Sequence, residues 1–151
     1  MRLSDKVLKQ RFDKFNQKYF NGELSEPKFV KTGSRWTAGM FNCDVYVATY
    51  DDGSRHMSML KDIKIMLSKY LIKNSRILDN ILLHEMIHYY GYQMDKDIKG
   101  SHGRFFKRMA NKINKDGYNV QTYYREDWWQ ERRKRKNSFG QNISFHLPTY
   151  L

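Results

Sequence analysis

Cysteine and proline are scarce in this chain of 151 residues, which has one cysteine and two prolines. The lone Cys43 excludes an internal disulfide and any zinc ribbon built from two or four cysteines of this chain. We interpret it as a small, half-buried residue of a strand. A reduced, intracellular protein with a cytoplasmic location is therefore expected, and its length suits one domain with a modest core.

Long apolar runs are also missing. No stretch reaches the roughly 20 apolar residues that a transmembrane helix needs. The N-terminal sequence MRLSDKVLKQRF lacks the apolar core of a secretory signal. Hydrophobic residues nevertheless make up 40% of the chain and aromatic residues 15%. This composition is typical of a globular protein, and we expect no membrane partner.

Acidic residues are outnumbered by basic ones, 16 against 28, which gives a formal net charge of +12. Such a surface attracts polyanions, above all nucleic acid. The densest basic run follows Trp128 and Trp129, and basic residues beside aromatic ones suit phosphate contact with base stacking. The alternative is that the tryptophans pack on the domain and the charges are solvated. The candidate nucleic-acid-binding residues are Arg132, Arg133, Lys134, Arg135 and Lys136.

The N-terminal segment has the periodicity of a helix with one apolar face. Ser4 is its candidate N-cap, and Asn21-Gly22 is a stop signal. The apolar face, spaced by steps of four, three and four residues, consists of Leu8, Phe12, Phe15 and Tyr19.

Short runs of β-branched or aromatic residues follow Pro27 and are separated by turn-forming residues. They predict three or four antiparallel strands, with Asp51-Asp52-Gly53 as a hairpin turn. The four runs are residues 28–30, 36–41, 45–50 and 63–67.

Two further helices are predicted after the strands, which makes the fold class α+β, with a small antiparallel sheet packed against about three helices. Asn74 or Ser75 would cap a central helix that continues to about Tyr90-Gly91. The third helix would begin after His102 and end at Asp116-Gly117, and residues 118–124 could add a strand or an extended segment. The apolar face of the third helix would consist of Phe105, Met109 and Ile113.

The central helix carries an H-E-x-x-H motif, which begins at His84 and ends at His88. Residues four apart lie on one helix face, so these two histidines can direct imidazole nitrogens at a single point. Glu85 projects to one side, where it can reach a water held on a metal without itself being a ligand. Catalytic zinc usually has three protein ligands. His102 is the candidate third ligand, because the flanking Gly100 and Gly103 allow a sharp turn back to the helix.

Other residues near the motif have more than one interpretation. Asp95 or Asp97 could accept a hydrogen bond from a ligand histidine, although solvated loop acids are more common. A group that stabilises an oxyanion is not identified by the motif. The nearby candidates are Tyr89, Tyr90 and Tyr92, although tyrosines in such positions more often serve packing.

Several short segments around the motif, over about residues 8 to 120, occur in the same order as in a known protein family. They are Phe15-Asn16, Tyr19 to Leu24, Ala38-Gly39, Leu82 to His88, Asp95 to Asp97, Gly100 to Phe106, and Asn111 to Asn114. In these segments the chain resembles the SprT-like metalloprotease domain of the Spartan and SprT proteins. The resemblance implies a zincin-like domain, which we place at residues 1–124. The change in composition predicts that residues 125–151 are a basic, tryptophan-containing tail that packs on the domain or extends from it. It also implies proteolysis near DNA, as in the Spartan branch.

The resemblance further implies that His84, His88 and His102 bind one Zn²⁺ per chain and that Glu85 is the catalytic base. Many family members continue into a cysteine-bearing zinc ribbon that helps to bind DNA. The single cysteine cannot build that ribbon, and the basic tail could substitute for it.

The predicted function is that of a zinc metalloprotease, an endopeptidase of the HExxH zincin type that cleaves protein substrates. A water activated by zinc would attack the peptide bond, with Glu85 as general base. An edge strand, with Trp36 to Phe41 as candidate, could pair with extended substrate. The expected protein is a monomer that acts on DNA-associated proteins, with nucleoid association as a further possibility. The alternative is a basic nucleic-acid-binding protein with a structural metal site and little or no peptidase activity.

Overall fold

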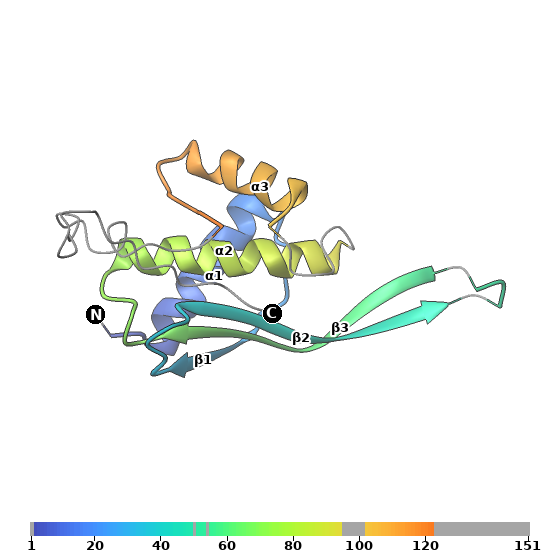
Figure 1. Cartoon of the computed structure of the whole chain (residues 1–151), viewed down its shortest axis with the longest axis horizontal. Helices are drawn as coiled ribbons and strands as arrows, with labels where there is room; N and C mark the ends of the chain where they lie inside the picture. Colours follow the sequence, from blue (N-terminus) through green and yellow to red (C-terminus); the bar gives the residue numbers. More distant parts are fainter. Residues whose placement is uncertain (1, 50, 54, 95–101, 123–151) are drawn as a thin grey trace, which may run out of the picture.

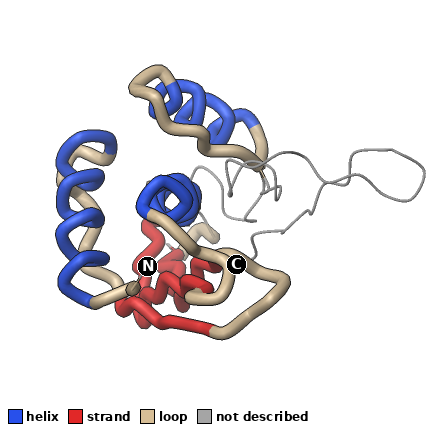
Figure 2. Tube along the Cα trace, turned by 90° about the vertical axis from the view of Figure 1, so that its left-hand side faces the viewer, coloured by secondary structure: helices blue, strands red, loops and turns tan. Residues whose placement is uncertain are grey.

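The computed structural model describes residues 2–49, 51–53, 55–94 and 102–122, which form a sheet with helices on one side (Figures 1 and 2). The central helix α2 lies on the sheet, α1 lies beside it, and α3 packs on the side of α2 that faces away from the sheet. The α+β class is therefore confirmed. The elements in chain order are α1 (Asp5–Tyr19), β1 (Lys28–Thr32), β2 (Gly39–Thr49), β3 (Arg55–Ser68), α2 (Ser75–Gln93) and α3 (Arg104–Asn114).

β3 is the middle strand of the sheet, whose order is β1-β3-β2. It pairs with β2 in antiparallel orientation but with β1 in parallel orientation, with Lys28 opposite Lys64. The prediction of an entirely antiparallel sheet is therefore wrong for β1. The alternation of side chains within a strand is the same for both orientations, so the sequence pattern does not encode the direction of the partner.

Two of the predicted strands, residues 36–41 and 45–50, contribute to a single strand, β2. The pairing register with β3 shifts between Asn42 and Asp44, which places Cys43 at a β-bulge rather than in a turn. Asp62, opposite this irregularity, has a φ of 50°. Asn42, Cys43 and Asp44 resemble a turn signal in the sequence, but the bulge lets them form part of one continuous strand.

The predicted hairpin turn is confirmed. Residues 51–53 form a turn between the end of β2 and the start of β3, and Thr49 is paired with Arg55 across the end of the hairpin. Gly53 has a φ of 85°, which glycine adopts without steric penalty. The run 63–67 is the second half of β3, so four predicted runs correspond to three strands.

α1 begins and ends where the sequence predicts. The Ser4 hydroxyl accepts a hydrogen bond from the backbone N–H of Val7 at 3.2 Å, as an N-cap does. Asn21 and Gly22 follow the helix with φ values of 55° and 67°, a left-handed backbone that cannot continue a helix. The predicted apolar face is buried, as the low exposure of Leu8, Phe12, Phe15 and Tyr19 shows.

α2 is buried on most of its surface because the sheet, α1 and α3 surround it. Asn74 is the N-cap, since its Oδ1 accepts a hydrogen bond from the backbone N–H of Ile77 at 2.9 Å. The helix continues to Gln93, two residues beyond the expected end. His84, Glu85 and His88 all lie in this helix, and each has at most 1% of its surface exposed. The polar motif is therefore held within the core.

α3 differs from the prediction in the face that it buries. The fully packed residues are Phe106, Ala110 and Ile113, whereas Phe105 and Met109 are half-buried at the margin of the core. Residues 118–122 form no strand. The predicted tail, including the basic residues 132–136, lies outside the described residues. Within the described part of the chain, no helix combines the length and the apolar character of a membrane span.

Candidate metal centre

The three histidines singled out by the sequence come together in the fold. The Nε2 atom of each lies 3.2 Å from the Nε2 atoms of the other two. His84 and His88 project from successive turns of α2, and His102 lies two residues before α3 begins. The packing of α3 on α2 therefore completes a triangle of ring nitrogens that neither helix could form by itself.

The geometry of this triangle fits a zinc ion. Zinc binds imidazole nitrogen at about 2.0–2.1 Å in tetrahedral geometry, which separates the ligand nitrogens by about 3.3–3.4 Å. The observed 3.2 Å is close to that separation. Ring N–H groups could not all point into so small a space, whereas nitrogen lone pairs that share one ion can. Three imidazoles with no carboxylate or thiolate form a neutral donor set that suits zinc.

Burial determines the protonation of the histidines. It lowers the pKa of His84 well below the ordinary value, and the neighbouring His88 and His102 lower it further. Burial, with His102 as the second cause, lowers the pKa of His88 to about 3. These two rings are therefore neutral at pH 7, which is the state that a metal ligand requires.

The tautomer of His84 follows from one hydrogen bond. Nδ1 of this ring lies 2.6 Å from the backbone carbonyl oxygen of Gln121. A carbonyl oxygen only accepts, so Nδ1 carries the proton and Nε2 is the unprotonated nitrogen of the neutral ring. Sequence reasoning missed this contact, because any residue supplies a backbone carbonyl and no side-chain pattern marks it. The predicted orienting acids, Asp95 and Asp97, lie outside the described residues.

Phe106 packs against all three imidazoles. Its ring centroid lies 4.7 Å from that of His84, 5.1 Å from that of His88 and 4.8 Å from that of His102. The side chain is fully buried. It restricts ring rotation and excludes water from one side of the cluster. The sequence predicted a neighbouring stripe of α3 as the packed face, and so it did not identify this contact.

The side chain of Glu85, which belongs to α2, lies against Gly39, the first residue of β2. The side chain is fully buried, and a Cβ placed on Gly39 would be 3.2 Å from its Oε1 atom. Among the described residues, the potential metal-ligand atoms that lie within 4.8 Å of one another belong to the three histidines and not to Glu85. The carboxylate therefore stands outside the ligand triangle, a position that suits a base rather than a ligand.

The tyrosines that follow the motif have structural contacts. The Tyr89 hydroxyl donates to the carbonyl oxygen of Ser25 at 3.0 Å, and its ring stacks on Phe41 with centroids 5.2 Å apart. Tyr90 packs against Phe20. These contacts favour the packing interpretation for both residues. None of them identifies an oxyanion-stabilising group.

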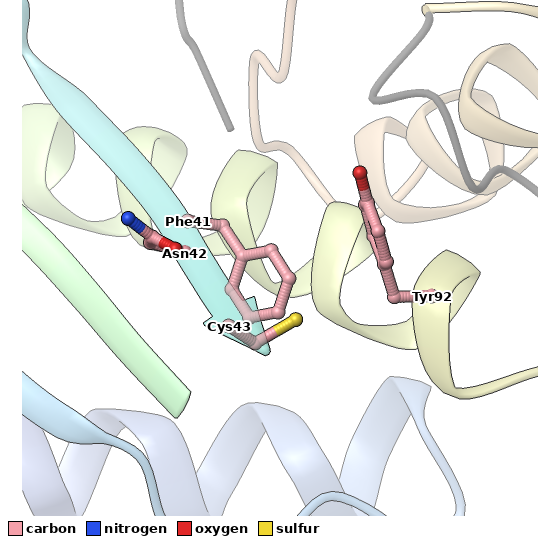
Figure 3. Close-up of a pocket in the computed structure, with 4 residues that line it drawn as sticks. All are labelled: Phe41, Asn42, Cys43 and Tyr92. Atoms are coloured by element: carbon pink, nitrogen blue, oxygen red, sulfur yellow. The ribbon is translucent and has the colours of Figure 1, made fainter. Parts of the chain in front are cut away.

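A small cavity of about 40 Å³ lies beside the end of α2, lined by Tyr92 and by Phe41, Asn42 and Cys43 of β2 (Figure 3). Cys43 is half-buried in β2, as predicted from the sequence, and it lies at the bulge, which was not predicted. Burial raises the pKa of its thiol to about 11. The thiol is therefore protonated at neutral pH and is a poor nucleophile.

Comparison with protein-family models supports what the site suggests. The SprT-like family matches over residues 8–125. That range includes the three clustered histidines, Glu85 and almost all of the described fold. A search of curated proteins gives no match. Because the family match extends over most of the sequence, the chain belongs to the SprT-like family.

Proposed function

We propose that this chain is a zinc-dependent metallopeptidase that hydrolyses peptide bonds in protein substrates. The observation that carries the proposal is the triangle of Nε2 atoms, each 3.2 Å from the next, beside a buried glutamate of the same helix. Membership of the SprT-like family supports it independently. An arrangement of three protein ligands leaves the fourth position that a catalytic zinc site needs.

The proposed roles follow from the positions of the side chains. His84, His88 and His102 would hold one ion, and Phe106 would keep the three rings in place. When bound, zinc supplies the Lewis acidity that polarises a carbonyl group and makes water acidic enough to lose a proton near neutral pH. Glu85 would accept that proton on its carboxylate and later deliver it to the leaving amine.

The sheet offers a place for an extended substrate. β2 is an edge strand, and its first residue, Gly39, lies against Glu85. Backbone groups along such an edge can pair with a peptide in extended conformation, as in other strand-addition complexes. We propose that β2 positions the scissile bond near Glu85 in this way. Of the candidate segment from Trp36 to Phe41, residues 39–41 belong to the strand.

The test combines metal analysis with proteolysis. The purified protein should contain about one zinc per chain and should cleave an unstructured protein such as casein. Glu85→Gln should retain the zinc and lose cleavage, because the amide cannot accept the proton. His102→Ala is the complementary variant, since it should lose both. A Glu85→Gln protein that cleaves as fast as the parent would show that another group is the base.

The net charge of +12 favours DNA as a second partner. We propose that DNA-associated proteins are the substrates, in which case single-stranded DNA should accelerate cleavage of histones. The alternative, a nucleic-acid-binding protein with a structural metal, requires tight DNA binding without turnover. Substitution of Arg132, Arg133, Lys134, Arg135 and Lys136 by glutamine should weaken DNA binding and reduce its salt dependence if this segment contacts phosphates.

A further inference from the structure

The chain segment that reaches His84 is held in place by an asparagine at the end of α3. Oδ1 of Asn114 accepts a hydrogen bond from the backbone N–H of Val120 at 2.7 Å. Nδ2 of the same side chain donates to the carbonyl oxygen of Val120 at 3.0 Å. One amide thus satisfies both backbone groups of a residue that is only 2% exposed. We call this pair of hydrogen bonds the Asn114 clamp.

A second contact ties the same segment to α2. Oδ1 of Asn80 accepts a hydrogen bond from the backbone N–H of Asn119 at 2.9 Å. Asn80 precedes His84 by four residues, so it lies one helical turn away on the same face of α2. Residues 119 and 120 are therefore joined to α2, which carries His84 and His88, and to α3, which begins two residues after His102. The next carbonyl group along the chain, that of Gln121, accepts the hydrogen bond from Nδ1 of His84.

We propose that Asn114 is a positioning residue for the metal centre. Its clamp on Val120 fixes the Gln121 carbonyl, which holds His84 as the Nδ1–H tautomer with the Nε2 lone pair directed at His88 and His102. Without the clamp, residues 119–121 keep the hydrogen bond to Asn80 but lose the two to Asn114, so the position of the Gln121 carbonyl is less firmly fixed. His84 can then adopt the other tautomer or rotate, and in both arrangements Nε2 no longer offers its lone pair within the triangle.

This inference rests on the proposed zinc site and deepens it. Partners that orient a metal-ligating histidine typically contribute about 10–100-fold to metal affinity. Asn114 acts through the Gln121 carbonyl and not on His84 directly, so we expect Asn114→Ala to raise the zinc dissociation constant by about tenfold, the lower end of that range. Asn114→Asp keeps an acceptor for the Val120 N–H but places a second acceptor oxygen against the Val120 carbonyl, so it should also weaken zinc binding.

The fold contains a matched control for this experiment. Asn16 of α1 forms the same clamp on Leu24: its Nδ2 donates to the Leu24 carbonyl at 2.8 Å, and its Oδ1 accepts from the Leu24 N–H at 3.1 Å. Asn16 is 7% exposed and Leu24 is 4% exposed, so this clamp is also buried. It fixes the loop between α1 and β1 rather than the segment at His84. Asn16→Ala should therefore reduce stability while leaving zinc affinity within about twofold of the parent.

The experiment measures zinc affinity by competition with a chromophoric chelator, and the free energy of unfolding by urea, for the full chain and the three variants. A second measurement uses long-range ¹H–¹⁵N correlation spectra of the histidines in the zinc-free protein, which report the tautomer directly. His84 should be the Nδ1–H tautomer in the parent and in Asn16→Ala, and a mixture in Asn114→Ala. Should Asn114→Ala fail to fold, Asn114→Asp provides both measurements.

The inference is overturned if the Asn114 variants bind zinc as tightly as the parent, or if Asn16→Ala weakens binding to the same extent. An unchanged His84 tautomer in the Asn114 variants would also overturn it. Failure of the proposed function has a different signature, namely a parent protein that binds no zinc. In that case the tautomer spectra of the zinc-free protein still decide whether the clamp orients His84.

Discussion

Gly39 of β2 lies so close to Glu85 of α2 that no side chain fits between them. A Cβ on residue 39 would come within 3.2 Å of the Oε1 and Cγ atoms of Glu85, and within 2.7 Å of Cγ2 of Ile81. Both neighbours are fully buried and have little space in which to move. The strand backbone therefore forms one wall of the space that the carboxylate occupies.

Gly39→Ala should disturb this contact. Overpacking a buried site typically costs about 1–3 kcal/mol of folding free energy, and here it would also displace the Glu85 carboxylate. We expect lower stability and lower peptidase activity with unchanged zinc content. Gly33→Ala is the control, because a Cβ there would meet no atom within 4 Å. Equal activity and stability in the two variants would show that Gly39 has no such role.

Zinc removal should destabilise the fold. A ligand that binds only the native state stabilises it by about 4 kcal/mol at a concentration 1,000-fold above Kd. For a chain of this size, that corresponds to a rise in Tm of roughly 8–16 °C, to be measured by scanning calorimetry with and without zinc. His102→Ala removes one corner of the ligand triangle and should show little or no zinc-dependent shift. An equal shift in that variant would place the zinc elsewhere.

Phe106→Ala should reduce both stability and zinc affinity. Removal of a buried phenylalanine side chain typically costs about 3–5 kcal/mol, and the cavity would lie directly against the three imidazoles. Urea unfolding of the zinc-free protein measures the first effect and chelator competition the second. Phe105→Ala, at the half-buried neighbouring position, should have a smaller effect on stability and none on zinc binding.

The stability should depend on pH through Asp116. The Tyr19 hydroxyl donates to Oδ2 of Asp116 at 2.6 Å and, together with Lys18 at 3.5 Å, lowers the pKa of that carboxyl. A carboxyl group with a depressed pKa in the folded state contributes stability above its unfolded pKa of about 4. That contribution is lost as the pH falls through the folded value.

The parent and Asp116→Asn should therefore differ most in stability near neutral pH. The difference should shrink as the pH falls below about 4, because protonation removes the charge that the substitution also removes. Urea unfolding at a series of pH values measures it. A difference that stays constant down to pH 3 would assign the contribution of Asp116 to its shape rather than its charge.

The local features of the fold were predictable, and the long-range ones were not. Ser4 and Asn74 cap their helices through contacts with residues three positions away, so the signal lies within a few residues of sequence. The parallel pairing of β1 with β3 depends instead on the path of the intervening chain. The bulge at Cys43 likewise depends on its partner strand, and its residues resemble a turn when read without that strand.

The same distinction applies to the candidate site. The spacing of His84 and His88 within one helix predicts that both can bind the same metal ion. The glycines around His102 predict a turn that brings this residue to the same place. The three Nε2 atoms do come together. The supports of the site, namely Phe106 and the Gln121 carbonyl, act through tertiary contacts between separate elements. A backbone carbonyl and a phenylalanine in an apolar stripe carry no distinguishing pattern in the sequence.

Beyond the bulge, β2 and β3 continue as a two-stranded ribbon past the end of α2 (Figure 1). Of the ribbon side chains whose burial is described, Tyr46 of β2 is 53% exposed and Met59 of β3 is 54% exposed, whereas Phe41 of β2 is fully buried. A hairpin without a packed layer behind it is only marginally stable. Amide hydrogen exchange should therefore require near-global unfolding at Phe41 and only local fraying near Tyr46. The same pair of strands would thus exchange its amide hydrogens slowly in the part that α2 covers and fast in the part that extends past α2.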